Sequence, residues 1–235
     1  MADKGGNILL AGATGLVGSQ VLNGLLADAR WHGRVFAPVR RKLEANDARL
    51  VPLVTDFSDK PDRGVELETS LKSLLAGERI ATFVCCLGTT IKTAGSREAF
   101  IAIDRELVLR LAGLSRKLGA RQAILVSSAG ASRQSGNFYL RVKGEVEDGI
   151  EAQGFARVDL LRPGLLIGAR NERRPGESVA QVLSPIGDLF LRGRFARYRS
   201  IAASDVAKAA LRLIGNAEEG VFAHDTPALE QLAAG

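Results

Sequence analysis

The sequence predicts an α/β protein that is built on a doubly wound parallel sheet. Short apolar runs such as residues 80–87 alternate with longer segments in which apolar residues recur every three or four positions, as in residues 96–118. The runs are typical of strands buried on both faces of a parallel sheet, and the longer segments are typical of amphipathic helices. This alternation predicts parallel strands that are joined by right-handed crossovers. With 235 residues, 46% of them hydrophobic, the chain fits a single domain over residues 1–235.

The first predicted strand, residues 7–11, ends in a turn with Gly12, Gly15 and Gly18 and continues into an amphipathic helix. The N–H groups at the start of such a helix have no partner within it, so with the positive end of the helix dipole they attract a phosphate. Glycine allows a pyrophosphate to approach the backbone. We therefore expect a dinucleotide to bind here, with a tight turn that holds no ligand as the alternative. The expected contacts are Gly12, Ala13, Thr14, Gly15, Leu16, Val17 and Gly18.

The second strand is expected over residues 34–39, and Arg40, Arg41 and Lys42 follow it directly. In NAD-binding sheets of this kind, an acidic residue about 20 positions beyond the glycines binds the ribose 2′-OH, whereas an arginine there suits a 2′-phosphate. No acidic residue follows this strand before Glu44. We therefore predict NADP(H), with Arg40 or Arg41 clamping the phosphate. A solvated basic turn is the alternative.

Two further strands are expected to end in cofactor contacts. Asp56 and Phe57 follow the strand predicted over residues 50–54, beside the expected adenine. The strand over residues 80–87 stops at a Gly-Thr-Thr turn. Strand ends in this architecture open onto the ligand crevice, so the turn is a candidate wall of the nicotinamide ribose site, with an ordinary polar turn as the alternative. The contacts expected at this end are Leu87, Gly88, Thr89 and Thr90.

One long helix is predicted over residues 96–118, and Asp104 within it is assigned no function. The strand after it, residues 123–126, delivers Ser127 and Ser128 to the same edge of the sheet as the glycine turn. Ser128 has no Gly-x-Ser-x-Gly turn around it and no histidine placed to act as its base, which argues against a hydrolase.

Tyr139 and Lys143 lie four positions apart in a helical stretch, so their side chains are expected on one face of the helix. Hydride transfer to a carbonyl requires a proton at the developing alkoxide, which favours a group whose pKa is near neutral. The pKa of free tyrosine is about 10, and a neighbouring ammonium lowers it by stabilising the phenolate. We therefore expect Tyr139 to be the acid/base, Lys143 to tune it and Ser128 to hold the substrate oxygen. A surface tyrosine beside a solvated lysine is the alternative.

Five motifs, taken in order, resemble the Tat-interacting oxidoreductase family, an atypical group of the short-chain dehydrogenase/reductase superfamily. They are CCLGTT, IDRELVL, VSSAGAS, NFYLRVKGEVE and LRPGLLIGARNERRPGE, and with the glycine turn they span about residues 8–177. The resemblance implies a Rossmann fold, NADPH binding and a Ser–Tyr–Lys set at Ser128, Tyr139 and Lys143.

The resemblance implies further contacts and partners. Lys143 would also bind the nicotinamide ribose, and Ser127 would lie at the cofactor, although which of Ser127 and Ser128 faces the substrate stays open. Family members in animals are credited with regulatory protein partners, and the substrate of the family is poorly defined. The segment expected along the nicotinamide is Pro163, Gly164, Leu165 and Leu166.

The pattern loosens after residue 164, and residues 165–200 are expected to form a small cap on the substrate side. A helix is predicted over residues 202–214, followed by a short apolar segment around Val221 and by loosely held final residues. Basic side chains in the cap could bind an acidic substrate or nucleic acid, but a solvated loop is favoured. They are Arg192, Arg194, Arg197 and Arg199.

Composition argues against several other classes. The net charge of +6 could indicate nucleic acid, but the basic residues are mostly scattered, so we expect none. No apolar run approaches the roughly 20 residues of a membrane span and the N-terminus resembles no signal peptide, so a cytoplasmic protein is expected. Cys85 and Cys86 are adjacent within a strand, and His32 and His224 lack partners at metal spacing. We therefore expect no disulfide, no metal and two surface histidines.

These observations favour an NADP(H)-dependent oxidoreductase that acts on a small carbonyl or alcohol substrate. The alternative is an NADPH-binding sensor or regulatory protein that turns over little and binds a protein partner. A homodimer is left open.

Overall fold

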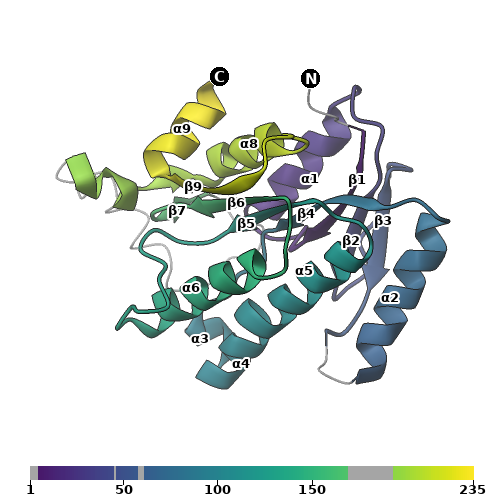
Figure 1. Cartoon of the computed structure of the whole chain (residues 1–235), viewed down its shortest axis with the longest axis horizontal. Helices are drawn as coiled ribbons and strands as arrows, with labels where there is room; N and C mark the ends of the chain where they lie inside the picture. The colour runs from purple at the N-terminus through teal and green to yellow at the C-terminus, as the bar shows by residue number, and fades with distance from the viewer. Residues whose placement is uncertain (1–4, 45, 58–60, 169–192) are drawn as a thin grey trace.

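The computed structural model describes residues 5–44, 46–57, 61–168 and 193–235. A parallel sheet of seven strands in the order β3-β2-β1-β4-β5-β6-β9 forms its centre (Figure 1). Each neighbouring pair in this sheet is parallel. The strands are β1 (Asn7–Ala11), β2 (Val35–Val39), β3 (Leu50–Val54), β4 (Ile80–Cys85), β5 (Gln122–Val126), β6 (Arg157–Arg162) and β9 (Gly220–Asp225).

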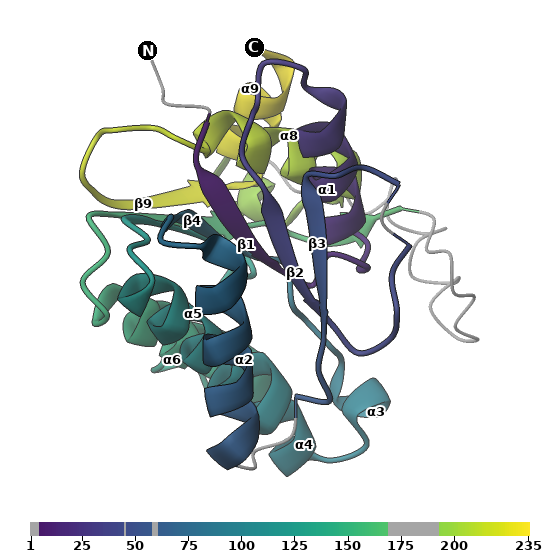
Figure 2. The same cartoon turned by 90° about the vertical axis from the view of Figure 1, so that its right-hand side faces the viewer.

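Helices cover both faces of this sheet (Figures 1 and 2). Successive residues of a strand point to opposite faces. Accordingly, Ile8 and Leu10 pack into one hydrophobic core with α1 and α8, whereas Leu9 and Ala11 pack into a second core with α2, α5 and α6. The doubly wound arrangement that the sequence predicts is confirmed. The helices are α1 (Gly18–Ala27), α8 (Ala203–Leu213) and α9 (Thr226–Ala234) on one side, and α2 (Pro61–Leu75), α5 (Val108–Lys117) and α6 (Phe138–Glu151) on the other.

The strand order reverses between β1 and β4. The chain runs from β1 outward through β2 to β3 and then returns to place β4 on the other side of β1. Ala11 pairs with Cys85 at the carboxyl ends of these two strands. The connections after β1 and β4 therefore leave the sheet in opposite directions, and the crevice between them is where doubly wound sheets bind their ligands.

The long helix predicted over residues 96–118 is interrupted. Helix α4 (Arg97–Ile101) leads into a π-helix over Ala102–Leu107, and regular helical geometry resumes in α5. A separate helix, α3 (Ile91–Ala94), precedes α4. A π-turn adds one residue to a helical turn. The apolar residues of this segment still recur every three or four positions, so the hydrophobic pattern did not indicate the π-turn.

The C-terminal end is ordered, so the expectation of loosely held final residues is wrong. Strand β9 pairs with β6 along six residues, and Asp225 caps α9 by accepting a hydrogen bond of 3.3 Å from the Ala228 N–H. Leu229 of α9 is fully buried in the core that contains α8. This burial stabilises a terminal helix that the sequence pattern alone did not predict.

The region expected to form a substrate-side cap is described only in part. Residues 169–192, which include the NERRPGES stretch, lie outside the described residues. The described remainder contains a 3₁₀-helix over Gly193–Tyr198 and a two-stranded pair of β7 (Leu166–Ile167) with β8 (Ile201–Ala202). The cap stays a prediction. Within the residues that the structure describes, no helix is both long and apolar enough to cross a bilayer.

Candidate active site

The glycine turn connects β1 to α1 at the switch point of the sheet. Gly12 has a φ of 82°, and a Cβ at this position would lie 2.7 Å from the backbone of Cys86. A Cβ on Gly18 would collide with the Gly12 carbonyl. Both glycines are therefore required by packing alone. Gly15 differs, because it is exposed and a Cβ there would lie 3.2 Å from the Gly12 oxygen, which leaves Gly15 as the position where a ligand could approach the backbone.

The start of α1 offers free hydrogen-bond donors at this turn. No side chain caps the helix, whose N-cap residue is Val17. Within the described residues, the N–H groups of Leu16, Val17 and Gly18 donate to no protein acceptor. Open amides at the positive end of a helix suit a diphosphate.

Two arginines lie at the same edge of the sheet as the glycine turn. Arg40 and Arg41 directly follow β2, which pairs with β1 through Ile8 and Val35. Both arginines are exposed, and neither forms an ion pair within the described parts of the chain. Their position is suitable for a ribose 2′-phosphate.

The residues after β3 adopt an unusual backbone conformation. Phe57 has a φ of 54°, which is uncommon for a residue with a side chain. Its carbonyl accepts a hydrogen bond of 3.4 Å from Arg110 Nη2, while the neighbouring Asp56 is exposed. The structure thus places both expected adenine contacts at the carboxyl edge of the sheet, next to β2.

Lys143 and Asp104 form the most buried ion pair at this edge. Lys143 Nζ lies 2.9 Å from Asp104 Oδ1, and the two side chains are 5% and 0% exposed. Asp104 Oδ2 accepts a hydrogen bond of 2.9 Å from the Thr89 N–H, in the loop after β4. Burial would lower the pKa of the Lys143 ammonium, but its acidic neighbours, of which Asp104 has the largest effect, together outweigh burial, so the pKa of Lys143 is raised. Lys143 is therefore a cation in the folded protein.

Tyr139 lies beside Lys143, as the four-residue spacing predicted. Lys143 Nζ is 5.9 Å from the centroid of the Tyr139 ring, and the ring itself is half-buried. The Phe100 ring packs against it with a centroid distance of 5.8 Å. Helix α6 is held in place by Asn137, whose side chain accepts from the Leu140 N–H at 3.2 Å, and by Gly144, where any Cβ would collide with the backbone of the preceding loop.

The two serines leave β5 at the same edge. Ser127 is buried and its N–H donates to the Leu161 carbonyl at 2.7 Å, while its Oγ has no partner among the described residues. Ser128 is half-buried. Among the described residues, no hydrogen bond joins either hydroxyl to Tyr139, so which serine faces a substrate stays open.

The Pro-Gly segment after β6 lies beside the serine loop. The Ala129 N–H donates to the Pro163 carbonyl at 2.8 Å, and the Gly164 N–H donates to Thr226 Oγ1 at 2.9 Å. Thr226 in turn donates to the Arg197 carbonyl at 2.9 Å. A buried threonine thus ties the Pro-Gly segment to the 3₁₀-helix. The sequence did not identify Thr226 as a site residue, because a threonine at the start of a helix is ordinarily expected to cap that helix.

Several candidates outside this edge differ from expectation. Asp104, to which the sequence assigns no function, is the carboxylate that pairs with Lys143. His224 is not a surface histidine, since its ring is 15% exposed and its Nε2 lies 3.0 Å from Asp159 Oδ1. Cys85 is buried and Cys86 is partly buried, and both are free thiols. Within the described chain, no cluster of potential ligands could hold a metal ion.

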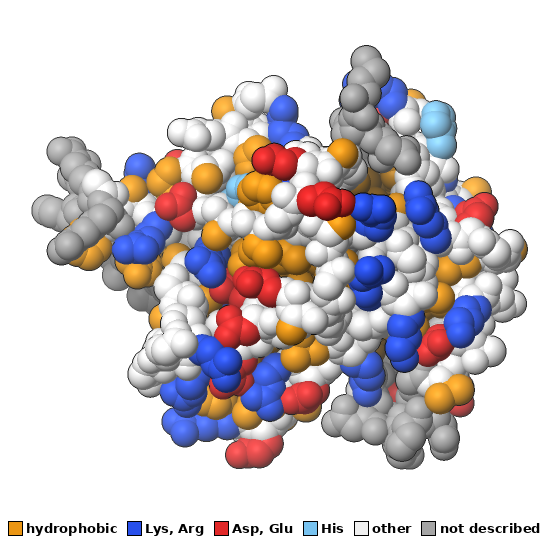
Figure 3. Space-filling view, viewed as in Figure 1, with side chains coloured by type: hydrophobic (Ala, Val, Ile, Leu, Met, Phe, Trp, Pro, Cys, Tyr) orange, Lys and Arg blue, Asp and Glu red, His pale blue; other side chains and the backbone are white. Residues whose placement is uncertain are grey.

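The arginines of the expected cap are only partly described. Arg192 lies outside the described residues, as does the side chain of Arg194, whereas Arg197 and Arg199 are exposed. On the face seen in Figure 3, Lys and Arg side chains are spread over the surface and interspersed with Asp and Glu. This face presents no single basic stripe among its described residues.

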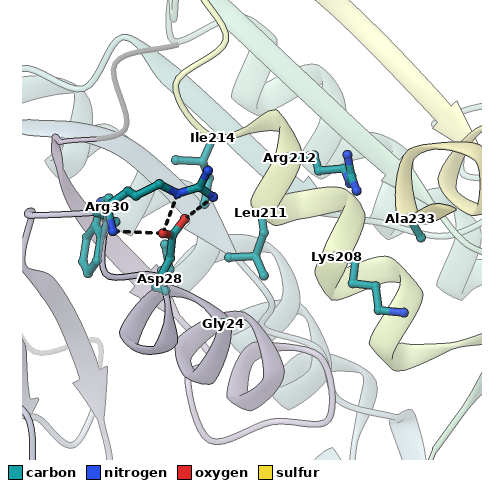
Figure 4. A pocket seen from close by; sticks show the side chains of 10 residues that line it. Gly24, Asp28, Arg30, Lys208, Leu211, Arg212, Ile214 and Ala233 are labelled. Carbon is teal, nitrogen blue, oxygen red and sulfur yellow. Dashed lines mark hydrogen bonds and ion pairs between the residues drawn. The ribbon is translucent and has the colours of Figure 1, made fainter. Parts of the chain in front are cut away.

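A cavity of about 460 Å³ opens away from the candidate site, between α1 and α8 (Figure 4). Its lining includes Gly24, near the C-terminal end of α1, and Leu211 of α8, whereas the glycine turn lies at the opposite end of α1. Arg30 at its rim is paired with Asp28 at 3.1 Å. The cavity is therefore distinct from the crevice at the switch point.

The fold and the site together define a Rossmann-type dinucleotide-binding protein. More specifically, the chain belongs to the NAD dependent epimerase/dehydratase family, whose family model matches residues 8–140. It is 36% identical over 179 residues to the protein fmp52, mitochondrial, of Emericella nidulans, covering 74% of this chain and 73% of that protein. It is also 45% identical over 97 residues to the protein HTATIP2 of Rattus norvegicus, covering 41% and 40%. The latter match confirms the likeness to the Tat-interacting family.

Solved structures confirm the fold. MoeE5 in complex with UDP-glucuronic acid and NAD superposes with a TM-score of 0.67 at 17% identity, covering 93% of this chain and 75% of that chain. A putative NAD-dependent epimerase/dehydratase from Bacillus halodurans superposes with a TM-score of 0.65 at 21% identity, covering 98% and 99%.

The expectation of a cytoplasmic protein is wrong by the same comparisons. The fmp52 proteins of Emericella nidulans and Eremothecium gossypii, 36% and 35% identical to this chain, are named mitochondrial. The prediction relied on the lack of a secretory signal, and that observation does not distinguish the cytoplasm from an organelle.

Proposed function

We propose that the protein is an NADP(H)-dependent oxidoreductase that interconverts a small carbonyl compound and its alcohol. The observation that carries this proposal is the placement of Tyr139 beside a buried, charged Lys143 at the carboxyl edge of the sheet. A phenol next to a fixed cation can give up and take back a proton, which is what carbonyl reduction and alcohol oxidation require.

The residues at the switch point fit a dinucleotide cofactor. The exposed Gly15 and the open amides at the start of α1 suit its diphosphate. Arg40 and Arg41 suit a 2′-phosphate, although MoeE5, named above, was solved in complex with NAD. When bound, the nicotinamide supplies or accepts the hydride.

The protein side chains then have separate tasks. Tyr139 donates its phenol proton to the carbonyl oxygen as reduction proceeds, and it accepts that proton back in the reverse direction. Lys143 stabilises the resulting phenolate and binds the nicotinamide ribose. Ser128 holds the substrate oxygen by a hydrogen bond, and the buried walls around Lys143 exclude water, which strengthens these interactions.

A second function is favoured by the Asp104 carboxylate. Asp104 pairs with Lys143 at 2.9 Å and offsets part of its charge, so less of that charge acts on Tyr139. A site tuned in this way also suits an NADPH-binding sensor or regulatory protein that turns over slowly and presents a surface to a protein partner. Partner binding and homodimer formation both stay predictions.

One screen distinguishes these functions. The purified protein is mixed with NADPH and a panel of aldehydes, ketones and quinones, and NADPH absorbance is followed beside a calorimetric titration of NADPH. Consumption of NADPH with at least one compound supports the oxidoreductase. Tight NADPH binding without consumption across the panel contradicts it and supports the sensor.

A further inference from the structure

The cavity between α1 and α8 has apolar walls and a charged rim. Its apolar walls come from three helices and from the loop after α1, where the Trp31 side chain is 2% exposed. The other apolar wall residues are Leu25 of α1, Leu211 and Ile214 at the end of α8, and Ala233 of α9. Small-molecule sites are cavities of about 300–1,000 Å³ in which apolar walls are combined with a few polar groups. This cavity, of about 460 Å³, has the size of such a site.

The helices around the cavity pack closely against each other. A Cβ on Gly24 of α1 would collide with Leu211 Cδ1 of α8, so these two helices approach as closely as a glycine allows. Helix α9 is fixed through Leu229, which is fully buried in the same core as Leu25. The cavity is therefore a preformed feature of the fold, and a preformed site lowers the entropic cost of binding a ligand.

The charges at the rim are not balanced. The rim carries Arg30, Lys208 and Arg212 together with the carboxylate of Asp28 (Figure 4). Arg30 Nε lies 3.1 Å from Asp28 Oδ1, and Lys208 Nζ lies 3.2 Å from Asp205 Oδ1. Arg212 differs, because among the described residues it forms no ion pair and donates no hydrogen bond. The cavity thus has one positive charge without a partner.

The helix dipole accounts for only part of this charge. Arg212 lies in the last turn of α8, where the negative end of the dipole favours a cation. That end is equivalent to about half an elementary charge, so it does not replace a carboxylate. The Arg212 side chain is exposed, and a planar guanidinium binds a carboxylate through two parallel hydrogen bonds. One bound anion would therefore complete the charge balance of the rim.

We propose that the cavity is a second ligand site, which binds a small organic monoanion. A compact apolar body contacts the walls that Trp31, Leu211 and Ile214 provide, and the anionic group pairs with Arg212. The cavity lies at the end of α1 opposite the glycine turn, so this ligand and a dinucleotide can be bound together. The inference does not depend on the proposed reaction.

The chain allows a direct measurement, because Trp31 is its only tryptophan. Intrinsic tryptophan fluorescence therefore reports from the wall of this cavity alone, and isothermal titration calorimetry gives an independent affinity. The probes are 4-tert-butylbenzoate, 4-tert-butylbenzyl alcohol and 4-tert-butylbenzylammonium, which share one apolar body and differ in charge. We expect saturable binding of the benzoate, binding of the alcohol that is at least about tenfold weaker, and no saturable binding of the ammonium compound.

Two variants and a matched control place the probe in the cavity. Arg212→Gln should weaken benzoate binding at least about tenfold and leave alcohol binding unchanged, because only the charge is removed. Ala233→Phe fills the cavity and should abolish the binding of both compounds. Arg116→Gln is the control, since Arg116 is an exposed arginine in the last turn of another helix, α5, and its loss changes the net charge equally.

Three results would overturn the proposal. The first is no saturable binding of the benzoate by either method, and the second is equal affinity for the benzoate and the alcohol. The third is an equal loss of benzoate affinity in Arg212→Gln and Arg116→Gln. Saturating NADP⁺ should leave the benzoate affinity unchanged, whereas competition would place the probe in the dinucleotide crevice and would likewise contradict a second site.

Discussion

Lys143 and Asp104 form an ion pair from which water is almost excluded, since their side chains are 5% and 0% exposed at a separation of 2.9 Å. Removing one partner leaves the other charge buried without compensation, which typically costs about 3–5 kcal/mol of folding free energy. We therefore expect Lys143→Met to lower the free energy of unfolding by about that amount. Denaturant unfolding followed by circular dichroism measures it.

The double variant Lys143→Met with Asp104→Asn is the control for this prediction. It contains no unpaired charge, so most of the lost stability should return. Equal stability of the single and double variants would mean that the pair is not buried in solution.

The three glycines of the turn should respond differently to alanine. Gly12→Ala places a Cβ on a backbone with φ of 82° and within 2.7 Å of Cys86, so it should lower stability by about 1–2 kcal/mol or more. The Cβ of Gly15→Ala lies 3.2 Å from the Gly12 oxygen and 3.9 Å from the Cys86 oxygen, so this variant should fold and yet bind NADPH at least about tenfold more weakly.

Gly136→Ala is the matched control, because a Cβ there has nothing within 4 Å. It should change neither thermal stability nor NADPH affinity. If Gly15→Ala binds NADPH as tightly as the parent, the diphosphate does not approach the backbone at Gly15.

Cofactor preference depends on Arg40 and Arg41. A hydrogen bond to a charged group contributes about 1.5–3 kcal/mol, so Arg40→Ala or Arg41→Ala should weaken NADPH binding roughly tenfold to a hundredfold and leave NADH binding nearly unchanged. Isothermal titration calorimetry with both cofactors measures this. Equal affinity of the parent protein for NADH and NADPH would contradict the prediction that Arg40 or Arg41 binds the 2′-phosphate.

Asp159 should make stability depend on pH in the acid range. Burial alone would raise its pKa, but hydrogen bonds from His224, Arg157 and Gln122 outweigh burial and hold the pKa of Asp159 below its usual value. A carboxyl whose pKa is lower in the folded state stabilises the protein above the unfolded-state pKa of about 3.9, and this stabilisation is lost as pH falls through the folded-state pKa.

Asp159→Asn should accordingly be less stable than the parent by about 3–5 kcal/mol near neutral pH, because Arg157 loses its buried partner and, among the described carboxylates, keeps only a contact of 3.7 Å with that of the exposed Glu218. The difference should shrink as the pH falls below about 4. Thermal melts across this range test the prediction, and a difference that is constant with pH would contradict it.

Much of the fold could be predicted because the strands β1 to β4 are nearly continuous apolar runs. Residues 50–54 form β3 as predicted, and the switch point follows from the glycine turn and the order of the strands. Helix α9 was missed because its stability comes from docking on α8 through Leu229. A short helix that is stabilised mainly by packing against another helix has only a weak helical pattern in its own sequence.

The candidate site could be predicted where its chemistry follows a local spacing. Tyr139 and Lys143 lie four residues apart on one helix, so the sequence alone places them together. Asp104 could not be found in this way, because its contact with Lys143 joins residues 39 positions apart and depends on a π-turn. His224 and Asp159 likewise meet only through the pairing of β6 with β9.

The central claim is that the Tyr139 phenol exchanges the proton of the reaction, and the turnover of Tyr139→Phe tests it most directly. With a carbonyl compound that the parent reduces, NADPH consumption by Tyr139→Phe should fall by at least about a hundredfold while NADPH affinity stays the same. Tyr198→Phe, which removes the other tyrosine, is the control for loss of a hydroxyl as such. Turnover by Tyr139→Phe at the parent rate would contradict the account.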